Sequence, residues 1–219
     1  MSAEIVTIYI DAEKINSKKA VLSATYAAMN DEISQINIIF TGKIIRKGPI
    51  NKEMKILYKS IAEYYDISFT HDDNIPKFEF YPVPRLAIIA YDSLGGCFVS
   101  TNAAVNLTKD DASIYYIDRK LKAHYLSPNL KSFFEMVIFY PSWKKDMGLS
   151  SSVPSVPIQK QQLLYLILKL DNTKFKLHKK RKNIDNIVIY PSFDDAKKEI
   201  NFYDMEETQN LIYQDQSFP

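Results

Sequence analysis

Apolar and β-branched residues recur through the middle of the chain in a pattern that predicts two β-hairpins. The runs over 86–91 and 97–101 flank the paired glycines at 95–96, which is the order of strand, tight turn and strand. The runs over 113–117 and 121–126 are rich in aromatic and β-branched residues and flank a short charged connection. These four strands are therefore expected to pair as two consecutive hairpins.

A helix is expected directly after the second hairpin. Ser127 is its predicted N-cap, and Pro128 fits the first helical position because that position needs no N–H donor. The apolar residues that follow have the spacing of a single helical face, namely Leu130, Phe133, Phe134, Val137 and Ile138. This stripe is wide enough to lie across a sheet, so the block over 86–140 predicts four strands covered by one helix.

The N-terminal part shows the same two periodicities. Residues 4–10 are predicted to form a strand. Residues 35–40 and 43–46 are predicted to form a hairpin that turns at Thr41–Gly42. The strongest helical stripe of the chain predicts a helix over 51–66.

Turn-forming residues separate a C-terminal part from the central block. Serine and proline are concentrated over 149–157, which predicts a loop or linker. Residues 159–170 are apolar enough for a buried helix, although the segment 166–170 also fits a strand. Further on, Ser192 with Asp195 three residues later has the form of a helix capping signal.

These patterns predict an α+β fold with a mainly antiparallel sheet and helices packed on one face. The central block over 86–140 is expected to lie in a main domain over 1–148. The linker over 149–157 and a C-terminal extension over 158–219 complete the chain. We expect the extension to pack on or beside the main domain.

The composition is that of a globular protein, and it excludes several kinds of chemistry. Hydrophobic residues make up 46% and charged residues 25% of the 219 residues. The spacings of phosphate-binding and dinucleotide-binding loops are absent from the sequence, and no cofactor is expected. The one cysteine, Cys97, fits a reducing compartment. Without a secretion signal or an apolar run as long as a membrane span, the chain is expected to be cytoplasmic.

The central block also resembles a known family. Its order is a hydrophobic strand, an aspartate, Leu-Gly-Gly, an aromatic strand, Ile-Tyr-Tyr-Ile, a charged turn, a strand, Ser-Pro and a helix with Phe-Phe. This order, over 86–140, is similar to that of the SUKH superfamily, and Ala90–Phe98 carries the resemblance most clearly. The resemblance implies a SUKH-like α+β fold and a non-enzymatic protein of the immunity type, which binds and neutralises a cognate bacterial toxin. It implies no catalytic residues.

Charge and aromatic patterns supply candidate partner-binding residues. The net charge of +2 is too small to attract nucleic acid over the whole surface, so such binding needs a local patch. The strongest local cluster of cations is Lys174, Lys176, Lys179, Lys180, Arg181 and Lys182. This basic cluster fits an acidic protein partner or a phosphate backbone, and its alternation with apolar residues also fits a solvated strand face. Tyr115, Tyr116 and Tyr125 lie on predicted strands, where those that face outward are candidate interface anchors.

Two alternative functions follow from other residues. Asp11 and Asp92 each end a predicted strand, and strand-end carboxylates bind Mg²⁺ or Mn²⁺ for phosphodiester hydrolysis when parallel strands bring them together. The segment Tyr9–Ile15 resembles the opening of PIN-like nucleases, so a metal-dependent nuclease is one alternative. A nucleic-acid-binding accessory protein that uses the basic cluster over 174–182 is the other.

Overall fold

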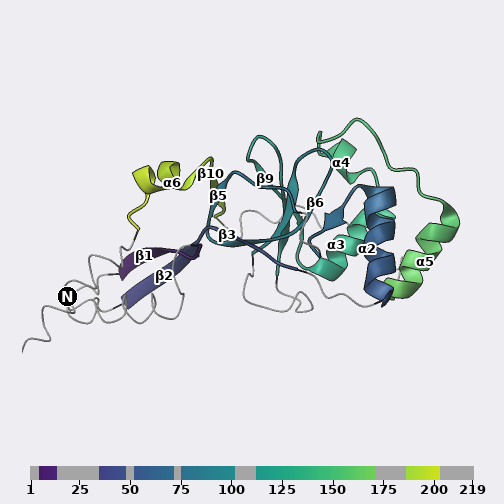
Figure 1. Cartoon of the computed structure of the whole chain (residues 1–219), viewed down its shortest axis with the longest axis horizontal. Helices are drawn as coiled ribbons and strands as arrows, with labels where there is room; N and C mark the ends of the chain where they lie inside the picture. Colours follow the sequence, from purple (N-terminus) through teal and green to yellow (C-terminus); the bar gives the residue numbers. More distant parts are fainter. Residues whose placement is uncertain are drawn as a thin grey trace, which may run out of the picture. The chain divides into compact units, whose positions relative to one another are not determined.

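The structure is a computed structural model that describes residues 5–13, 35–47, 52–71, 75–101, 112–170 and 186–202 (Figure 1). The chain divides into two units, which we call the central unit and the terminal unit. The central unit consists of Ile44–Phe78 and Leu86–Asn186. The terminal unit consists of Met1–Lys43, Glu79–Arg85 and Ile187–Pro219.

A six-stranded sheet organises the central unit. Four of its strands lie side by side in chain order, namely β6 (Leu86–Tyr91), β7 (Cys97–Ser100), β8 (Ile114–Ile117) and β9 (Ala123–Ser127). Every neighbouring pair of these four is antiparallel, so both predicted hairpins are confirmed. β3 (Lys43–Ile45) and β4 (Ser68–Phe69) each pair with β6.

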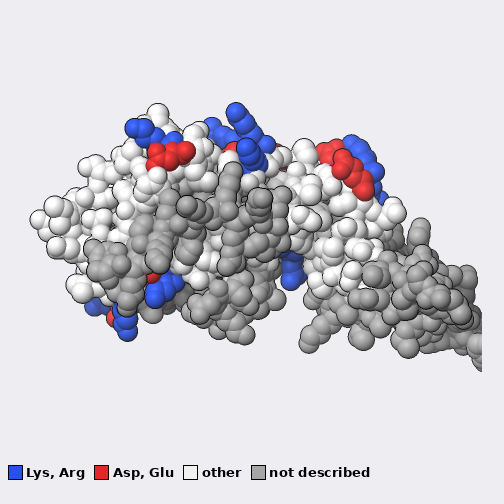
Figure 2. All heavy atoms as spheres, turned by 180° about the vertical axis from the view of Figure 1, so that it is seen from behind, with Lys and Arg blue, Asp and Glu red and all other residues white. Residues whose placement is uncertain are grey.

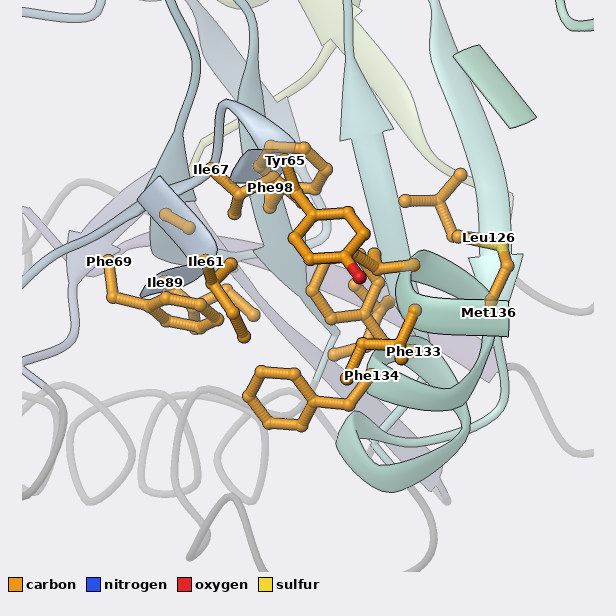
Figure 3. Packing of buried hydrophobic residues seen from close by; sticks show 14 of the residues in the cluster. Ile61, Tyr65, Ile67, Phe69, Ile89, Phe98, Leu126, Phe133, Phe134 and Met136 are labelled. Atoms are coloured by element: carbon orange, nitrogen blue, oxygen red, sulfur yellow. The ribbon is translucent and has the colours of Figure 1, made fainter. Parts of the chain in front are cut away.

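Two helices cover one face of this sheet. α2 (Lys52–Tyr65) and α3 (Leu130–Phe139) form where the apolar stripes predict helices. Their apolar side chains pack with strand residues in one buried cluster, as Figure 3 shows. Within the cluster, the ring centroid of Phe98 lies 5.4 Å from that of Phe133. The expected packing of helices on one face is therefore confirmed for the central unit.

The first turn of α3 differs from the prediction in its cap. The N-cap is Asn129, whose side chain accepts a hydrogen bond of 2.8 Å from the backbone N–H of Ser132. The hydroxyl of Ser127 instead donates to the carbonyl oxygen of Asn129. Because Asn129 has the extended backbone that an N-cap needs, the helix begins after Pro128 and not at it.

Two further helices follow, α4 (Trp143–Asp146) and α5 (Ile158–Leu168). α5 confirms the predicted helix and shows that the strand alternative for 166–170 is wrong, because Lys169 ends the helix with a left-handed φ of 51°. The expectation that this helix is buried is also wrong. Leu164 is its only fully buried residue, while Tyr165, Ile167 and Leu168 pack partly buried against the central cluster.

Two pairs of strands and a short helix form the described part of the terminal unit. β1 (Ile5–Asp11) and β2 (Gln35–Thr41) are parallel, whereas β5 (Tyr81–Val83) and β10 (Val188–Tyr190) are antiparallel. α6 (Phe193–Glu199) begins at the N-cap Ser192, whose side chain accepts a hydrogen bond from the backbone N–H of Asp195. The predicted capping signal is therefore confirmed.

The predicted hairpin at Thr41–Gly42 is wrong. Gly42 does turn the chain, with a φ of 83°, but β2 pairs with β1 and β3 pairs with β6. A parallel pair joins strands that are distant in sequence, while a hairpin signal is read from adjacent residues. The local sequence pattern therefore predicts β2, β3 and the turn at Gly42, but it does not predict which strand pairs with β2 or with β3.

The two units also differ from the expected domains. Residues 149–170 belong to the central unit, and the chain from Ile187 onward joins the first 43 residues in the terminal unit. The cause is strand pairing over long distances in sequence, since Val188 lies opposite Val83 and Phe202 forms a bridge with Tyr9. The expected main domain over 1–148 and extension over 158–219 are each divided between the units. The α+β class is as expected.

Candidate functional site

A buried ion pair lies at the turn of the first hairpin. Asp92 follows β6 directly and has no exposed side-chain surface, while Lys144 of α4 keeps 8% of its side chain exposed. The Nζ atom of Lys144 lies 2.9 Å from Oδ2 of Asp92. It also lies 5.8 Å from the ring centroid of Phe98 and 5.7 Å from that of Trp143. Each charge compensates the other, so removal of either one leaves an uncompensated charge out of water.

The Asp92 carboxylate also fixes the glycine turn. Its Oδ1 accepts a hydrogen bond of 2.9 Å from the backbone N–H of Gly96, and its Oδ2 accepts one of 2.8 Å from the hydroxyl of Tyr116. Gly95 has a φ of 78°, which favours glycine. At Gly96, a Cβ atom would lie 2.1 Å from the Tyr116 hydroxyl oxygen. The Leu-Gly-Gly motif is therefore explained by a left-handed turn and by close approach of the backbone to an aromatic ring.

Asp66 extends this network to the end of α2. Its carboxylate accepts hydrogen bonds of 3.0 Å from the backbone N–H of Ser93 and 2.9 Å from the hydroxyl of the same residue. One of its oxygens lies 3.4 Å from Nζ of Lys144, but the Asp66 side chain is 45% exposed. Solvent screening makes this ion pair weaker than the one with Asp92. The network links α2, the β6–β7 turn and α4.

The groups of this network bind one another and hold neighbouring elements of the central unit together. Burial raises the pKa of the Tyr116 hydroxyl far above its ordinary value, and the adjacent Asp92 carboxylate raises it further. Tyr116 therefore remains a protonated donor to Asp92. The cation that balances Asp92 is the ammonium group of Lys144, so a metal ion at Asp92 would have to displace that group.

Asp11, the other candidate metal ligand, ends a strand of a different sheet. Asp11 is the last residue of β1 in the terminal unit, whereas Asp92 follows β6 of the central sheet. The Asp11 residue is 4% exposed, and its Oδ1 accepts a hydrogen bond of 3.0 Å from the backbone N–H of Glu13. In the part of the chain that the structure describes, no group of three or more His, Cys, Asp and Glu side chains is placed to bind a metal ion.

The three tyrosines proposed as interface anchors differ in exposure. Tyr116 is 2% exposed and Tyr115 is 7% exposed, although they point to opposite faces of the sheet. The cause is that both faces of β8 are covered, so alternation along this strand does not separate buried from exposed side chains. Tyr125 meets the ring of Tyr115 edge on, at a centroid distance of 5.4 Å, and is partly exposed. Of the three, Tyr125 retains the most surface for a partner.

The second hairpin contains a contact between histidine and aspartate side chains that the sequence does not point to directly. Nε2 of His124 on β9 lies 2.8 Å from Oδ2 of Asp118 in the turn. The other carboxylate oxygen accepts hydrogen bonds from the backbone N–H groups of Lys120 and Lys122. A signal for this pair exists in the sequence, because an aspartate at the start of a hairpin turn and a histidine early in the returning strand lie near each other.

Asp118 makes an acid-sensitive contribution to stability. Burial raises the pKa of its carboxyl group, but hydrogen bonds from His124, Lys122 and Lys120 outweigh burial and hold the pKa below its ordinary value. A depressed folded-state pKa gives stability that is fully present above the unfolded-state value of about 3.9. That stability is lost as the pH falls through the lower folded-state value.

We therefore expect Asp118→Asn to reduce the free energy of unfolding at neutral pH, and the difference from wild type to shrink below about pH 3.9. Urea unfolding over a series of pH values measures this difference. His124→Gln is the matched control, because it keeps the two backbone hydrogen bonds to Asp118 and should give an intermediate effect. A difference between Asp118→Asn and wild type that stays constant into acid would contradict this prediction.

The basic cluster over 174–182 lies outside the described residues. Cys97 is buried, with 1% of its surface exposed, as expected for a small apolar side chain on a central strand. Among the helices that the structure describes, none combines the length and the apolar character that crossing a membrane requires.

Comparison of the chain with protein-family models, with curated proteins and with solved structures found no significant match. The function is therefore inferred from the residues of this chain and from the geometry described above.

Proposed function

We propose that this chain is a non-enzymatic binding protein of the immunity type, with a SUKH-like fold, that neutralises a cognate bacterial toxin by binding to it. The observation that supports the proposal most directly is that Asp92, in the block that resembles the family, is buried and bonded within the protein. Asp92 bonds to Lys144, Tyr116 and the glycine turn, all within the central unit. A buried carboxylate that is neutralised and hydrogen-bonded inside the protein stabilises the local structure, and we do not expect it to act on a substrate.

The arrangement of the block supports the same proposal. Two antiparallel hairpins followed by a helix across one face are what the resemblance implies, and β6 to β9 with α3 have this order. The strands of such a sheet present side chains to a partner at a regular spacing. We propose that the partner-binding residues include Tyr125 and the basic cluster over 174–182, whose six cations suit an acidic protein surface.

Co-expression with the product of the gene adjacent to the one that encodes this chain tests the proposal. We expect that product alone to stop growth of the host cells and the wild-type chain to restore it. A variant with all six cations of the basic cluster changed to glutamine should restore growth less well, because the attraction to an acidic partner is lost. A toxic product whose effect the wild-type chain leaves unchanged would contradict the proposal.

The nuclease alternative has one observation in its favour, which is the position of Asp11 at the carboxyl end of a parallel strand. Degradation of RNA or DNA by the purified chain with Mg²⁺ or Mn²⁺, lost in Asp11→Asn, would replace the proposal. An oligonucleotide mobility shift that disappears when Lys179, Lys180 and Arg181 are neutralised would favour the nucleic-acid-binding alternative.

A further inference from the structure

α5 leaves apolar side chains in contact with solvent. Leu166 is 77% exposed, and Leu163, three residues earlier, is 38% exposed. Residues three apart lie on the same side of a helix, so these two leucines form one apolar surface. Ile158, which is 68% exposed, lies at the N-terminal end of the same helix. We call Leu163 and Leu166 the α5 surface.

The orientation of α5 is fixed, so the α5 surface cannot turn inward. The side chain of Gln161 donates a hydrogen bond of 3.0 Å to the carbonyl oxygen of Ile138 at the end of α3. The ring of Tyr165 lies 4.9 Å, between centroids, from that of Phe139, and Leu164 is fully buried. Figure 1 shows α5 beside α2 and α3. Rotation that buried Leu166 would break these contacts.

The second half of α5 has a sequence typical of a helix that is covered on all sides. Residues 163–168 read Leu-Leu-Tyr-Leu-Ile-Leu, so apolar side chains project in every direction around the axis. Single exposed leucines are ordinary, but neighbouring ones on one helix mark a surface for association. Burial of each such side chain is worth about 1.5–3 kcal/mol. A partner that covered the α5 surface would gain this free energy.

The charged residues near the α5 surface indicate what charge a partner should carry. Over 147–170 the charged residues are Lys160 and Lys169, and both are exposed. The neighbouring helix α2 adds three exposed lysines and two exposed glutamates, so cations predominate on the described elements packed here, namely Lys52, Lys55 and Lys59 against Glu53 and Glu63. In Figure 2 the end of the central unit that α5 forms is mainly white, with few charged side chains over it. Carboxylates on a partner would be attracted to these lysines, and a basic partner would be repelled.

We infer that the α5 surface is the docking site for the protein partner, and that the partner covers it with apolar side chains bordered by aspartate or glutamate. This inference deepens the proposed function, on which it rests for the partner's identity. The evidence for it lies in the exposure, the fixed orientation and the cationic border of α5, all of which are separate from the network at Asp92.

Two substitutions of opposite charge at one position test both parts of the inference. Leu166→Glu and Leu166→Lys remove the same apolar contact, and the exposure of Leu166 makes both compatible with folding. Calorimetric titration with the purified product of the adjacent gene should show about a tenfold or greater loss of affinity for both. The glutamate variant should bind more weakly than the lysine variant. Ile45→Glu, at an apolar residue of β3 that is 49% exposed, is the matched control and should bind as wild type does.

A second probe separates this inference from the proposed function. A synthetic amphipathic helical peptide with leucines on one face and glutamates along its borders should shift the amide resonances of Leu163 and Leu166 in an NMR titration. The same peptide with lysines in place of the glutamates should shift them much less. If the acidic peptide binds and the product of the adjacent gene does not, the proposed function is wrong and the docking site stands.

Other results would overturn the docking site. These are binding of neither probe, wild-type affinity for the adjacent product in both Leu166 variants, and equal loss of affinity in the two variants. Self-association of the wild-type chain that Leu166→Glu abolishes would assign the surface to a second copy of this chain. Binding to phosphatidylglycerol vesicles that depends on Leu166 would assign it to a lipid surface.

Discussion

Replacing Asp92 with asparagine is expected to lower the free energy of unfolding by about 3–5 kcal/mol. The side chain is fully buried, and asparagine carries no charge to balance the Lys144 ammonium group that lies 2.9 Å away. The substitution also weakens the acceptor for the hydroxyl of Tyr116. Denaturant unfolding followed by the fluorescence of Trp143, the one tryptophan of the chain, measures the loss next to the affected residue.

A double-mutant cycle separates the ion pair from general damage. Lys144→Met alone leaves the Asp92 carboxylate buried and uncompensated, whereas the double variant of Asp92→Asn with Lys144→Met leaves no buried charge. The double variant should therefore lose less stability than the sum of the two single variants. Asp66→Asn, at a side chain that is 45% exposed, is the matched control and should cost about 1 kcal/mol or less. Additive losses would contradict the proposed coupling.

Replacing Gly96 with alanine is expected to cost roughly 3 kcal/mol, as overpacking combined with loss of a buried hydrogen bond. The added Cβ atom would lie 2.1 Å from the hydroxyl oxygen of Tyr116 and 2.3 Å from the ring carbon that bears it. Tyr116 is 2% exposed and hydrogen-bonded to Asp92, so it has little freedom to move. Thermal and denaturant unfolding of the variant measure the cost.

Two other variants identify the cause of that cost. Gly148 has a φ of 71°, but a Cβ atom there would meet no other heavy atom within 4 Å. Gly148→Ala should therefore show the backbone effect alone, about 1–2 kcal/mol. In a Tyr116→Leu background, Gly96→Ala should become less costly because the ring is gone. An unchanged cost in that background would show that the ring is not the obstacle.

The elements of the central block could be predicted from the sequence because their patterns are local. The paired glycines at 95–96 and the alternation on either side of them predict β6 and β7, and the stripe beginning at Leu130 predicts α3. Hairpins join neighbouring strands, so their partners could be predicted as well. The parallel pair of β1 and β2 could not, because nothing near Thr41 indicates a partner that ends at Asp11.

The site was harder to predict for the same reason. Asp92 was identified as a strand-end carboxylate, but its partner Lys144 lies on a helix that is far from it in the sequence. A lysine among charged neighbours normally indicates a solvated surface, and its burial depends on the packing of α4 beside Phe98. The exposed side of α5 could not be predicted, because an apolar run predicts a buried helix even where no other element of the chain packs against all of its sides.

We propose that Asp92 and the groups bonded to it hold the central sheet in shape for binding another protein. Titration of the purified wild-type chain with the product of the adjacent gene, in the presence and absence of Mg²⁺, tests this claim most directly. We expect a saturable complex that forms equally well without the metal ion and leaves RNA and DNA intact. Absence of a complex, together with nucleic-acid cleavage that requires Mg²⁺ and is lost in Asp11→Asn, would contradict it.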